Sequence, residues 1–143
     1  MDNHINLTME SLSQNESLAR TVVAAFIAPL DPDIDTLADI KTAASEAVTN
    51  AVIHGYKGTK GEITLDLILE DYKLYITVTD QGVGISNVER AMEPLFTTTT
   101  PDMERAGMGF TVMESFMDTV EVTSALGHGT TVMMIKDLKN GTS

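Results

Sequence analysis

Two runs of alternating apolar and polar residues in the middle of the chain most constrain its fold. The apolar positions are Ile63, Leu65, Leu67 and Leu69 in the first run and Leu74, Ile76 and Val78 in the second. A period of two residues is typical of strands that bury one face. Because only a few residues around Asp71 separate the runs, we predict an antiparallel hairpin whose apolar side chains share one side.

The rest of the chain predicts further strands and helices around this hairpin. Strands are expected near 5–9, 120–122 and 130–135, with a turn at 127–129 between the last two. Helices are expected over 13–28, 32–55 and 107–117, with a short helix over 86–92 and a loop over 97–102. This order predicts an α+β fold, a two-layer sandwich with a mainly antiparallel sheet and helices on one face.

Local capping signals set the predicted helix boundaries. Ser13 and Glu16 have the spacing of a capping box before the first helix. Asp31 and Pro32 fit the N-cap and the first position of the second helix, which is expected to end at Gly55. The side chains expected to face inward from the first helix are Leu18, Val22, Ala25 and Phe26.

Length and charge exclude several classes of function. The 143 residues fit a single domain, expected over 1–136 with a frayed tail over 137–143. A net charge of −12 argues against nucleic acid and against anionic membrane surfaces as partners. The chain has no Cys, its start lacks a basic signal sequence, and its longest apolar stretch, 22–30, is too short to span a bilayer. A cytoplasmic protein is therefore expected.

Glu46 and Asn50 lie four residues apart on the predicted long helix, so their side chains are neighbours. A solvated helix face would explain this pair. Alternatively, the carboxylate could orient a hydroxyl group while the amide oxygen ligates Mg²⁺.

Asp80 continues the alternation of Leu74, Ile76 and Val78, so its side chain is expected on the apolar face. It could instead turn out to solvent at the strand end. A buried carboxylate needs a hydrogen-bond donor, and the exocyclic amino group of adenine is a suitable one. Gly82 and Gly84 would let the backbone approach a flat ligand, and Ile85 could pack on its ring.

Gly107 and Gly109 precede the last predicted helix, and Arg105 lies just before them. Free N–H groups at a helix N-terminus can hold a phosphate, and Arg can bind it with two hydrogen bonds. A simple loop-to-helix junction would also explain the glycines. Together, the segments 46–50, 80–85 and 105–110 predict an ATP-binding pocket.

These segments resemble the motifs of the GHKL ATPase/kinase superfamily in order and spacing. The segment 46–55 looks like its N-box, 80–84 like its first glycine box and 107–109 like its second. Within the superfamily, the stretches 45–56, 94–98 and 104–110 look like the anti-sigma F factor family, short bacterial anti-sigma factors that are also serine kinases. The resemblance covers nearly the whole chain and implies the Bergerat ATP-binding fold.

The resemblance also implies a role for each matched residue. Glu46 would be the general base and Arg105 would reach the phosphate, with Asn50 as the Mg²⁺ ligand and Asp80 contacting adenine. The ATP/ADP-binding set would be Asn50, Asp80, Gly82, Gly84, Ile85, Thr97, Thr98, Arg105, Gly107, Met108, Gly109 and Thr130. Residues 97–106 would form a lid over ATP, and Glu16 and Arg20 would bind partners.

The partners implied by the resemblance are a sporulation-type sigma factor, sigma F, and an anti-anti-sigma protein phosphorylated on serine, with a homodimer as the assembly. The lid departs from the family pattern because Thr97 to Thr100 contains no Lys before Pro101. A nucleotide-gated sigma-binding module with little phosphotransfer, or a general-stress sigma regulator, therefore stays open as an alternative.

Overall fold

The computed structural model describes residues 2–56, 60–82, 101–125 and 127–139, and within 101–108 it describes the backbone only. Its strands are β1 (Asn3–Glu10), β2 (Glu62–Glu70), β3 (Lys73–Asp80), β4 (Thr119–Ser124) and β5 (Thr130–Asp137). Its α-helices are α1 (Asn15–Ile27), α2 (Ile34–Asn50) and α4 (Pro101–Phe116). A 3₁₀ turn, η1 (Ala28–Leu30), follows α1, and a π-helical turn, η2 (Ala51–Gly55), follows α2. The predicted short helix over 86–92 lies outside the described residues.

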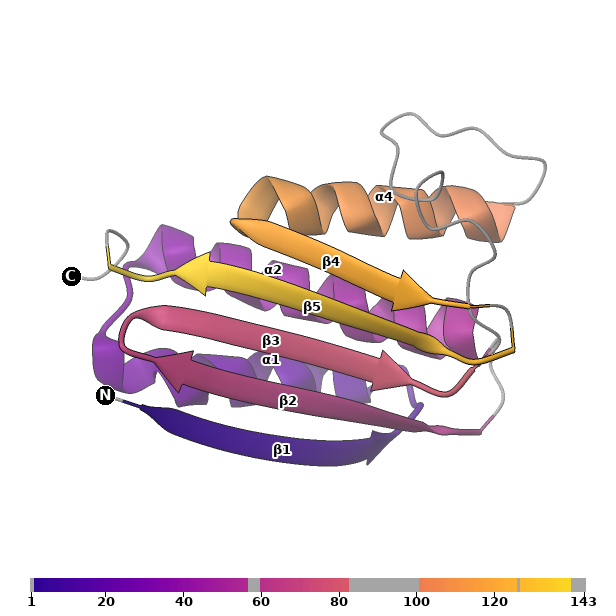
Figure 1. Ribbon diagram of the computed structural model, residues 1–143, viewed down its shortest axis with the longest axis horizontal. Coiled ribbons are helices and arrows are strands. Elements are labelled where there is room, and N and C mark those ends of the chain that lie inside the picture. The colour runs from indigo at the N-terminus through magenta and orange to yellow at the C-terminus, as the bar shows by residue number, and fades with distance from the viewer. Residues whose placement is uncertain (1, 57–59, 83–100, 126, 140–143) are drawn as a thin grey trace.

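The described strands form one antiparallel sheet in the order β1-β2-β3-β5-β4. The helices cover one face of this sheet, and Figure 1 shows the sheet in front with α1, α2 and α4 behind it. The predicted two-layer α+β sandwich is confirmed. The predicted hairpin is confirmed as well, since Glu70 pairs with Lys73 across a turn that begins at Asp71.

The alternating residues of the hairpin form the centre of the core. Leu65 of β2 pairs with Val78 of β3, and Leu67 pairs with Ile76. Their side chains are at most 2% exposed and face the helices. The sheet register therefore follows from the hydrophobic pattern, because a slip by one residue would turn every apolar side chain toward solvent.

The first helix differs from its prediction in which side chains it buries. Ala19, Val23, Phe26 and Ile27 face the core, whereas Leu18 is 43% exposed. The N-cap is Gln14 without a side-chain hydrogen bond, so the capping box is wrong. The carboxylate of Glu16 is instead used in a tertiary contact with α2, described below.

The start of the second helix also differs from its prediction. Asp31 adopts a left-handed conformation, with φ of 49°, and ends the turn η1. Asp33 is the N-cap of α2, because its side chain accepts a hydrogen bond of 2.7 Å from the backbone N–H of Thr36. This bond lowers the pKa of Asp33.

Structured chain continues past the predicted boundary at 136. Strand β5 ends at Asp137, and Leu138 is fully buried with its N–H donating to the carbonyl of Tyr72. The frayed tail expected over 137–143 therefore does not include Asp137 and Leu138.

Ile76→Ala is expected to lower the free energy of unfolding by about 2–5 kcal/mol, because it leaves a cavity where β3 packs against the helices. Ile34→Ala is the matched control, since Ile34 is 84% exposed and its truncation should change stability by less than about 0.5 kcal/mol. Urea unfolding followed by circular dichroism measures both variants. Equal losses in the two would contradict the assigned core.

Candidate functional site

Helix α2 divides its residues between the core and the candidate site. Ile40, Ala43, Ala44, Ala47 and Val48 are fully or almost fully buried. Their small average size lets the sheet and the neighbouring helices approach α2 closely. The remaining side of the helix carries the ionisable and amide groups that the sequence predicted.

Glu46 and Asn50 lie against α4 at Gly109. A Cβ atom added at Gly109 would be 2.9 Å from Nδ2 of Asn50 and 3.2 Å from Oε2 of Glu46. A side chain at this position would displace the ends of both site residues, so glycine lets α4 pack against α2 without moving them. The predicted helix motif and the second glycine motif thus meet in space, although about sixty residues separate them in sequence.

The Asn50 amide is a buried polar group with unused capacity. Its Nδ2 atom is shielded from solvent and has no hydrogen-bond partner within the described structure. Buried polar atoms in folded proteins nearly always have a partner, and exceptions often mark functional sites. The amide is thus available to a bound ligand.

Burial raises the pKa of Glu46, and the negative charge of Glu16 raises it further. A carboxylate with a raised pKa is a better proton acceptor than an ordinary surface glutamate. The solvated-face interpretation of the pair Glu46 and Asn50 does not account for this environment.

Asp80 ends β3 with its side chain on the apolar face, as predicted, and is 4% exposed. Its Oδ1 accepts a 2.9 Å hydrogen bond from the backbone N–H of Gly82. Burial raises the pKa of Asp80, while hydrogen bonds from the backbone N–H groups of Gly82 and Thr130 act in the opposite direction. The alternative of a solvated strand-end residue is therefore wrong.

Three glycines make room for this buried aspartate. A Cβ atom at Gly55 would lie 2.8 Å from Cγ of Asp80, and one at Gly129 would lie 2.2 Å from the Asp80 carbonyl oxygen. Gly82 in turn packs on the Gly55 carbonyl, 2.0 Å from the position of an added Cβ. Sequence reasoning identified Gly82, took Gly55 only as a helix terminator and Gly129 only as a turn residue, and assigned neither to the site.

Tyr56 holds this end of the molecule together and was not predicted. Its hydroxyl donates to the carbonyl of Glu62 at 2.6 Å and accepts from the backbone N–H of Gln81 at 2.7 Å. It therefore ties the π-helical turn η2 to the start of β2 and to the residue after Asp80. The sequence feature that could have indicated this role is the position of Tyr56 directly after Gly55, the expected end of the long helix.

Thr130, which the resemblance assigned to the ATP/ADP-binding set, lies opposite Asp80 in the sheet. Its hydroxyl shares a 2.8 Å hydrogen bond with that of Ser124 on β4. The residue is therefore a direct neighbour of Asp80 across the sheet.

Gly107 and Gly109 lie inside α4, not at its N-terminus. The helix already begins at Pro101, so Pro101 and Asp102 belong to the helix and not to a loop. Proline is well tolerated in the first turn of a helix, where its missing N–H is not required. A phosphate cradle formed by free N–H groups at a helix start is therefore wrong for residues 107–109.

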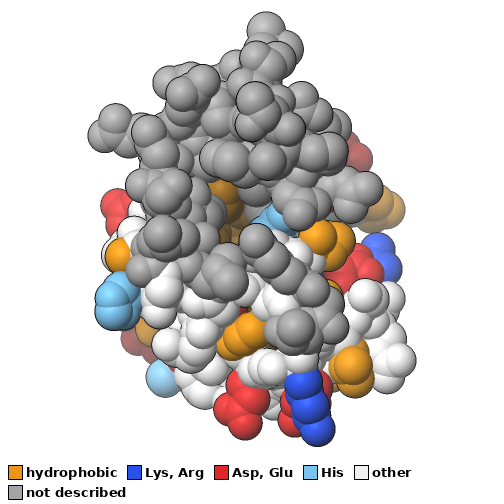
Figure 2. Space-filling view, turned by 90° about the vertical axis from the view of Figure 1, so that its right-hand side faces the viewer, with side chains coloured by type: hydrophobic (Ala, Val, Ile, Leu, Met, Phe, Trp, Pro, Cys, Tyr) orange, Lys and Arg blue, Asp and Glu red, His pale blue; other side chains and the backbone are white. Residues whose placement is uncertain are grey.

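Several predicted site residues are not described. Gly84, Ile85, Thr97 and Thr98 lie outside the described residues. Arg105, Gly107 and Met108 belong to α4 by their backbone, and their side chains lie outside the description as well. Figure 2 views the end of the molecule at which β3 terminates. It shows apolar and histidine side chains of described residues beside the atoms drawn in grey.

The predicted partner-binding residues form a pair on α1. Nε of Arg20 is 3.1 Å from Oε1 of Glu16, and the two side chains are 43% and 25% exposed. The Ser45 hydroxyl, on α2, donates to the same Oε1 atom. Glu16 therefore contacts the residue next to Glu46.

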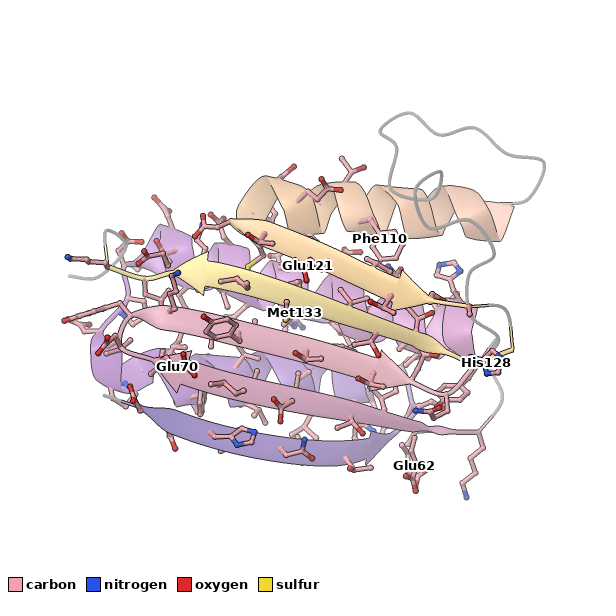
Figure 3. The ribbon with its side chains drawn as sticks, viewed as in Figure 1. Glu62, Glu70, Phe110, Glu121, His128 and Met133 are labelled. Atoms are coloured by element: carbon pink, nitrogen blue, oxygen red, sulfur yellow. The ribbon has the colours of Figure 1, made fainter. Side chains whose placement is uncertain are left out.

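The second layer behind the site is apolar. Phe110 is 1% exposed and follows Gly109 directly, and Figure 3 shows it on the side of α4 that faces β4.

Among the described residues, no group of three His, Asp or Glu side chains could hold a metal ion by itself. A metal held by Asn50 would therefore need oxygen ligands from a bound phosphate and from water. None of the described helices is long and apolar enough to cross a membrane.

Comparison with known proteins agrees with this geometry. The model of the histidine kinase-like ATPase domain family matches residues 9–136. The anti-sigma F factor of Bacillus licheniformis is 53% identical over 96% of this chain and 94% of its own, and that of Bacillus thuringiensis is 54% identical over 98% and 96%.

Solved structures share the fold at lower identity. The RsbU and RsbW domains of Rv1364c from Mycobacterium tuberculosis align with a TM-score of 0.68 at 22% identity, over 95% of this chain and 32% of that one. The catalytic domain of the histidine kinase ThkA aligns with a TM-score of 0.58 at 15% identity, over 96% and 97%.

The stability of the wild type is expected to fall relative to that of Asp80→Asn as the pH rises above the ordinary value of 3.8. The raised pKa means that the folded state holds the Asp80 proton more tightly than the unfolded state. Stability present below the ordinary value of 3.8 is therefore lost as the pH rises through the folded pKa, and asparagine cannot ionise. Urea unfolding at several pH values, followed by circular dichroism because the chain has no Trp, measures this.

Asp66→Asn is the matched control with the opposite sign. Burial alone would raise the pKa of Asp66, but hydrogen bonds from Asn6 and His4 and the charge of His4 lower it. The wild type should then lose stability relative to this variant as the pH falls toward 3. Parallel pH dependence in the two variants would be inconsistent with the buried Asp80.

Proposed function

Because this chain belongs to the histidine kinase-like ATPase domain family and to the anti-sigma F factors, we propose that it is an anti-sigma factor that transfers phosphate from ATP to a protein serine. Binding of ATP or ADP follows from the ATPase domain family. The observation that best supports kinase activity is that Glu46 and Asn50 both lie against Gly109. The pKa of the Glu46 carboxyl is raised, and the buried Nδ2 atom of Asn50 has no partner within the described structure.

Asp80 is proposed to select the base of the nucleotide. Its carboxylate is buried at the end of β3, and Gly55, Gly82 and Gly129 pack closely around this position. An ionised carboxylate accepts hydrogen bonds only, so it fits the N6 amino group of adenine. Gly84, Ile85 and Thr130 are proposed to complete this part of the pocket.

Asn50 is proposed to hold Mg²⁺ through its side-chain oxygen. An amide oxygen is a suitable hard ligand, and Mg²⁺ usually takes few protein ligands. The Nδ2 donor of the same amide, which has no partner within the described structure, is proposed to donate to a phosphate oxygen. The ion would neutralise the charge of the phosphates. Thr97, Thr98, Arg105 and Met108 are proposed to contact the phosphates, with Arg105 as the cation.

Glu46 is proposed to act as the general base. Its carboxylate accepts the proton of the substrate serine hydroxyl while that oxygen forms the new bond to the γ-phosphorus. The bond from phosphorus to the leaving oxygen of ADP breaks in the same transfer. The raised pKa of Glu46 supports this role, because a base whose pKa lies closer to neutral pH accepts a proton more readily.

The proposed partners are a sporulation-type sigma factor, sigma F, which the protein inhibits, and an anti-anti-sigma protein, which carries the serine. The names of the Bacillus relatives support the sigma factor. Arg20 and Glu16 are proposed to bind these partners, and the protein is proposed to act as a cytoplasmic homodimer. A nucleotide-gated sigma-binding module, or a general-stress sigma regulator, with little phosphotransfer is the second candidate, favoured by the lysine-free segment 97–100.

The wild type is expected to bind ATP and ADP and to reject GTP by a factor on the order of 10⁴, because guanine presents a carbonyl where adenine has an amino group. Asp80→Asn should lose most of this preference and still fold. Isothermal titration calorimetry with the three nucleotides measures both effects. Similar affinities of the wild type for ATP and GTP would show that Asp80 does not select adenine over guanine.

Glu46→Gln is expected to slow phosphorylation of the anti-anti-sigma serine by about 10²–10⁴-fold, because glutamine keeps the shape and removes the basicity. ATP binding and sigma binding should stay at the wild-type level. A single-turnover assay with radiolabelled ATP and the purified partner measures the transfer.

Glu70→Gln provides a control with the same change of charge, at the end of β2 beside the hairpin turn (Figure 3). It should transfer phosphate at the wild-type rate. A Glu46→Gln variant as fast as the wild type excludes Glu46 as the base. A wild type that holds its sigma factor in an ATP-dependent way without any transfer favours the binding module.

A further inference from the structure

The Tyr56 hydroxyl joins three backbone segments at the end of the molecule where β3 terminates. It donates a hydrogen bond to the carbonyl of Glu62 at 2.6 Å and accepts one from the backbone N–H of Gln81 at 2.7 Å. A phenol has one hydrogen to donate and lone pairs with which to accept, so these bonds use the hydroxyl in both roles. Phenylalanine could fill the same space but could make neither bond.

The ring of Tyr56 rests on a fixed piece of backbone at Gly61. A Cβ atom added there would lie 2.3 Å from Cε1 of the ring, so the ring lies directly against the glycine. The N–H of Gly61 donates to the Ser11 hydroxyl at 2.9 Å, and its carbonyl accepts from the Ser11 N–H at 2.9 Å. Ser11 is itself buried at the end of β1. These contacts hold the Tyr56 hydroxyl at a defined place relative to the sheet.

Tyr56 reaches this place through the π-helical turn η2. Its backbone N–H donates to the carbonyl of Ala51 at 3.1 Å and closes the turn. Such π-helical turns are rare, and they occur frequently at functional sites. Because η2 continues α2, the helix that carries Glu46 and Asn50 leads directly into the residue that holds the end of β3.

Gln81, the residue that Tyr56 holds, stands between two residues of the proposed adenine site. Asp80 precedes it, and Gly82 follows it and donates its backbone N–H to Oδ1 of Asp80 at 2.9 Å. The bond to the Gln81 N–H therefore fixes the peptide that joins Asp80 to Gln81, and with it the turn that orients the carboxylate. Neighbouring contacts act on the same turn, because Gly55 packs against the Asp80 carboxylate and Gly82 packs on the Gly55 carbonyl.

We propose that Tyr56 is a positioning residue for nucleotide specificity, whose hydroxyl holds the Asp80 carboxylate in the orientation that accepts from the adenine amino group. This inference rests on the proposed function, in which Asp80 selects the base. Hydrogen bonds weaken steeply as their angle departs from linear, so a carboxylate that is free to turn binds an amino group less well. Tyr56 acts through Asp80, and its role requires no contact between the phenol and the nucleotide.

Tyr56→Phe tests the hydroxyl, because it keeps the ring on Gly61 and removes both hydrogen bonds. The Kd values for ATP and ADP are expected to rise about tenfold, the effect of losing one or two hydrogen bonds of ordinary strength. The Kd for GTP should change by less than about threefold, since guanine has no favourable bond with Asp80 to lose. Tyr72→Phe is the matched control, because Tyr72 is 44% exposed and lies at the hairpin turn, at the other end of β3 from Asp80.

Displacement of a fluorescent ADP analogue by ATP, ADP and GTP, with Mg²⁺ present, measures the affinities of the wild type and both variants. A second measurement uses ¹⁵N NMR of the whole chain without nucleotide. In Tyr56→Phe the amide proton of Gln81 is expected to move upfield and to exchange faster with water, because it loses its acceptor. In Tyr72→Phe both the affinities and the Gln81 signal should match the wild type.

The outcomes separate the role of Tyr56 from the proposed function. If the wild type prefers ATP over GTP and Tyr56→Phe keeps the same preference, the role of Tyr56 is overturned. An equal loss of affinity for all three nucleotides overturns it as well, because a general loosening of the fold would weaken each of them alike. An unchanged Gln81 signal in Tyr56→Phe shows that the hydroxyl does not hold this turn. A wild type with equal affinity for ATP and GTP overturns the selection of adenine by Asp80, and the role of Tyr56 falls with it.

Discussion

The burial of the Asp80 carboxylate is the constraint on which the rest of the site depends. A buried acid is unfavourable unless its oxygens receive hydrogen bonds, and here the backbone N–H groups of Gly82 and Thr130 supply them. These bonds require a close approach of η2, the β3 end and the turn before β5. Glycine at positions 55, 82 and 129 makes that approach possible, because any larger residue would overlap backbone or the carboxylate itself.

One side of helix α2 packs in the core, and another side carries the site residues Glu46 and Asn50. Its buried alanines and Val48 bring it close to the sheet, and the same close packing brings Glu46 and Asn50 against Gly109 of α4. A glycine inside a helix costs up to about 1 kcal/mol relative to alanine. The contact with two site residues gives a reason for glycine at a position where helix stability alone would favour alanine.

The strands could be predicted from the sequence more reliably than the helix ends. The alternation from Ile63 to Val78 determines both the hairpin and its buried side, because a period of two residues leaves no other face for the apolar groups. The helix ends depend on which nearby polar group bonds the backbone. Glu16 fits a capping box by spacing, but its carboxylate bonds Ser45 on another helix. Asp33 caps α2 because Asp31 is already used to end the preceding turn.

The sequence by itself determined the α+β class, the inward direction of Asp80 and the neighbouring positions of Glu46 and Asn50, since these follow from the periods of strands and helices. Its net charge of −12 already argued against nucleic acid as a partner. Only the tertiary structure decided that Gly55 and Gly129 enclose Asp80, that Gly109 lies inside a helix against Asn50, and that Glu16 reaches Ser45. Local spacing sets the face on which a side chain lies. The residue that it meets there depends on how distant segments pack, which no local pattern specifies.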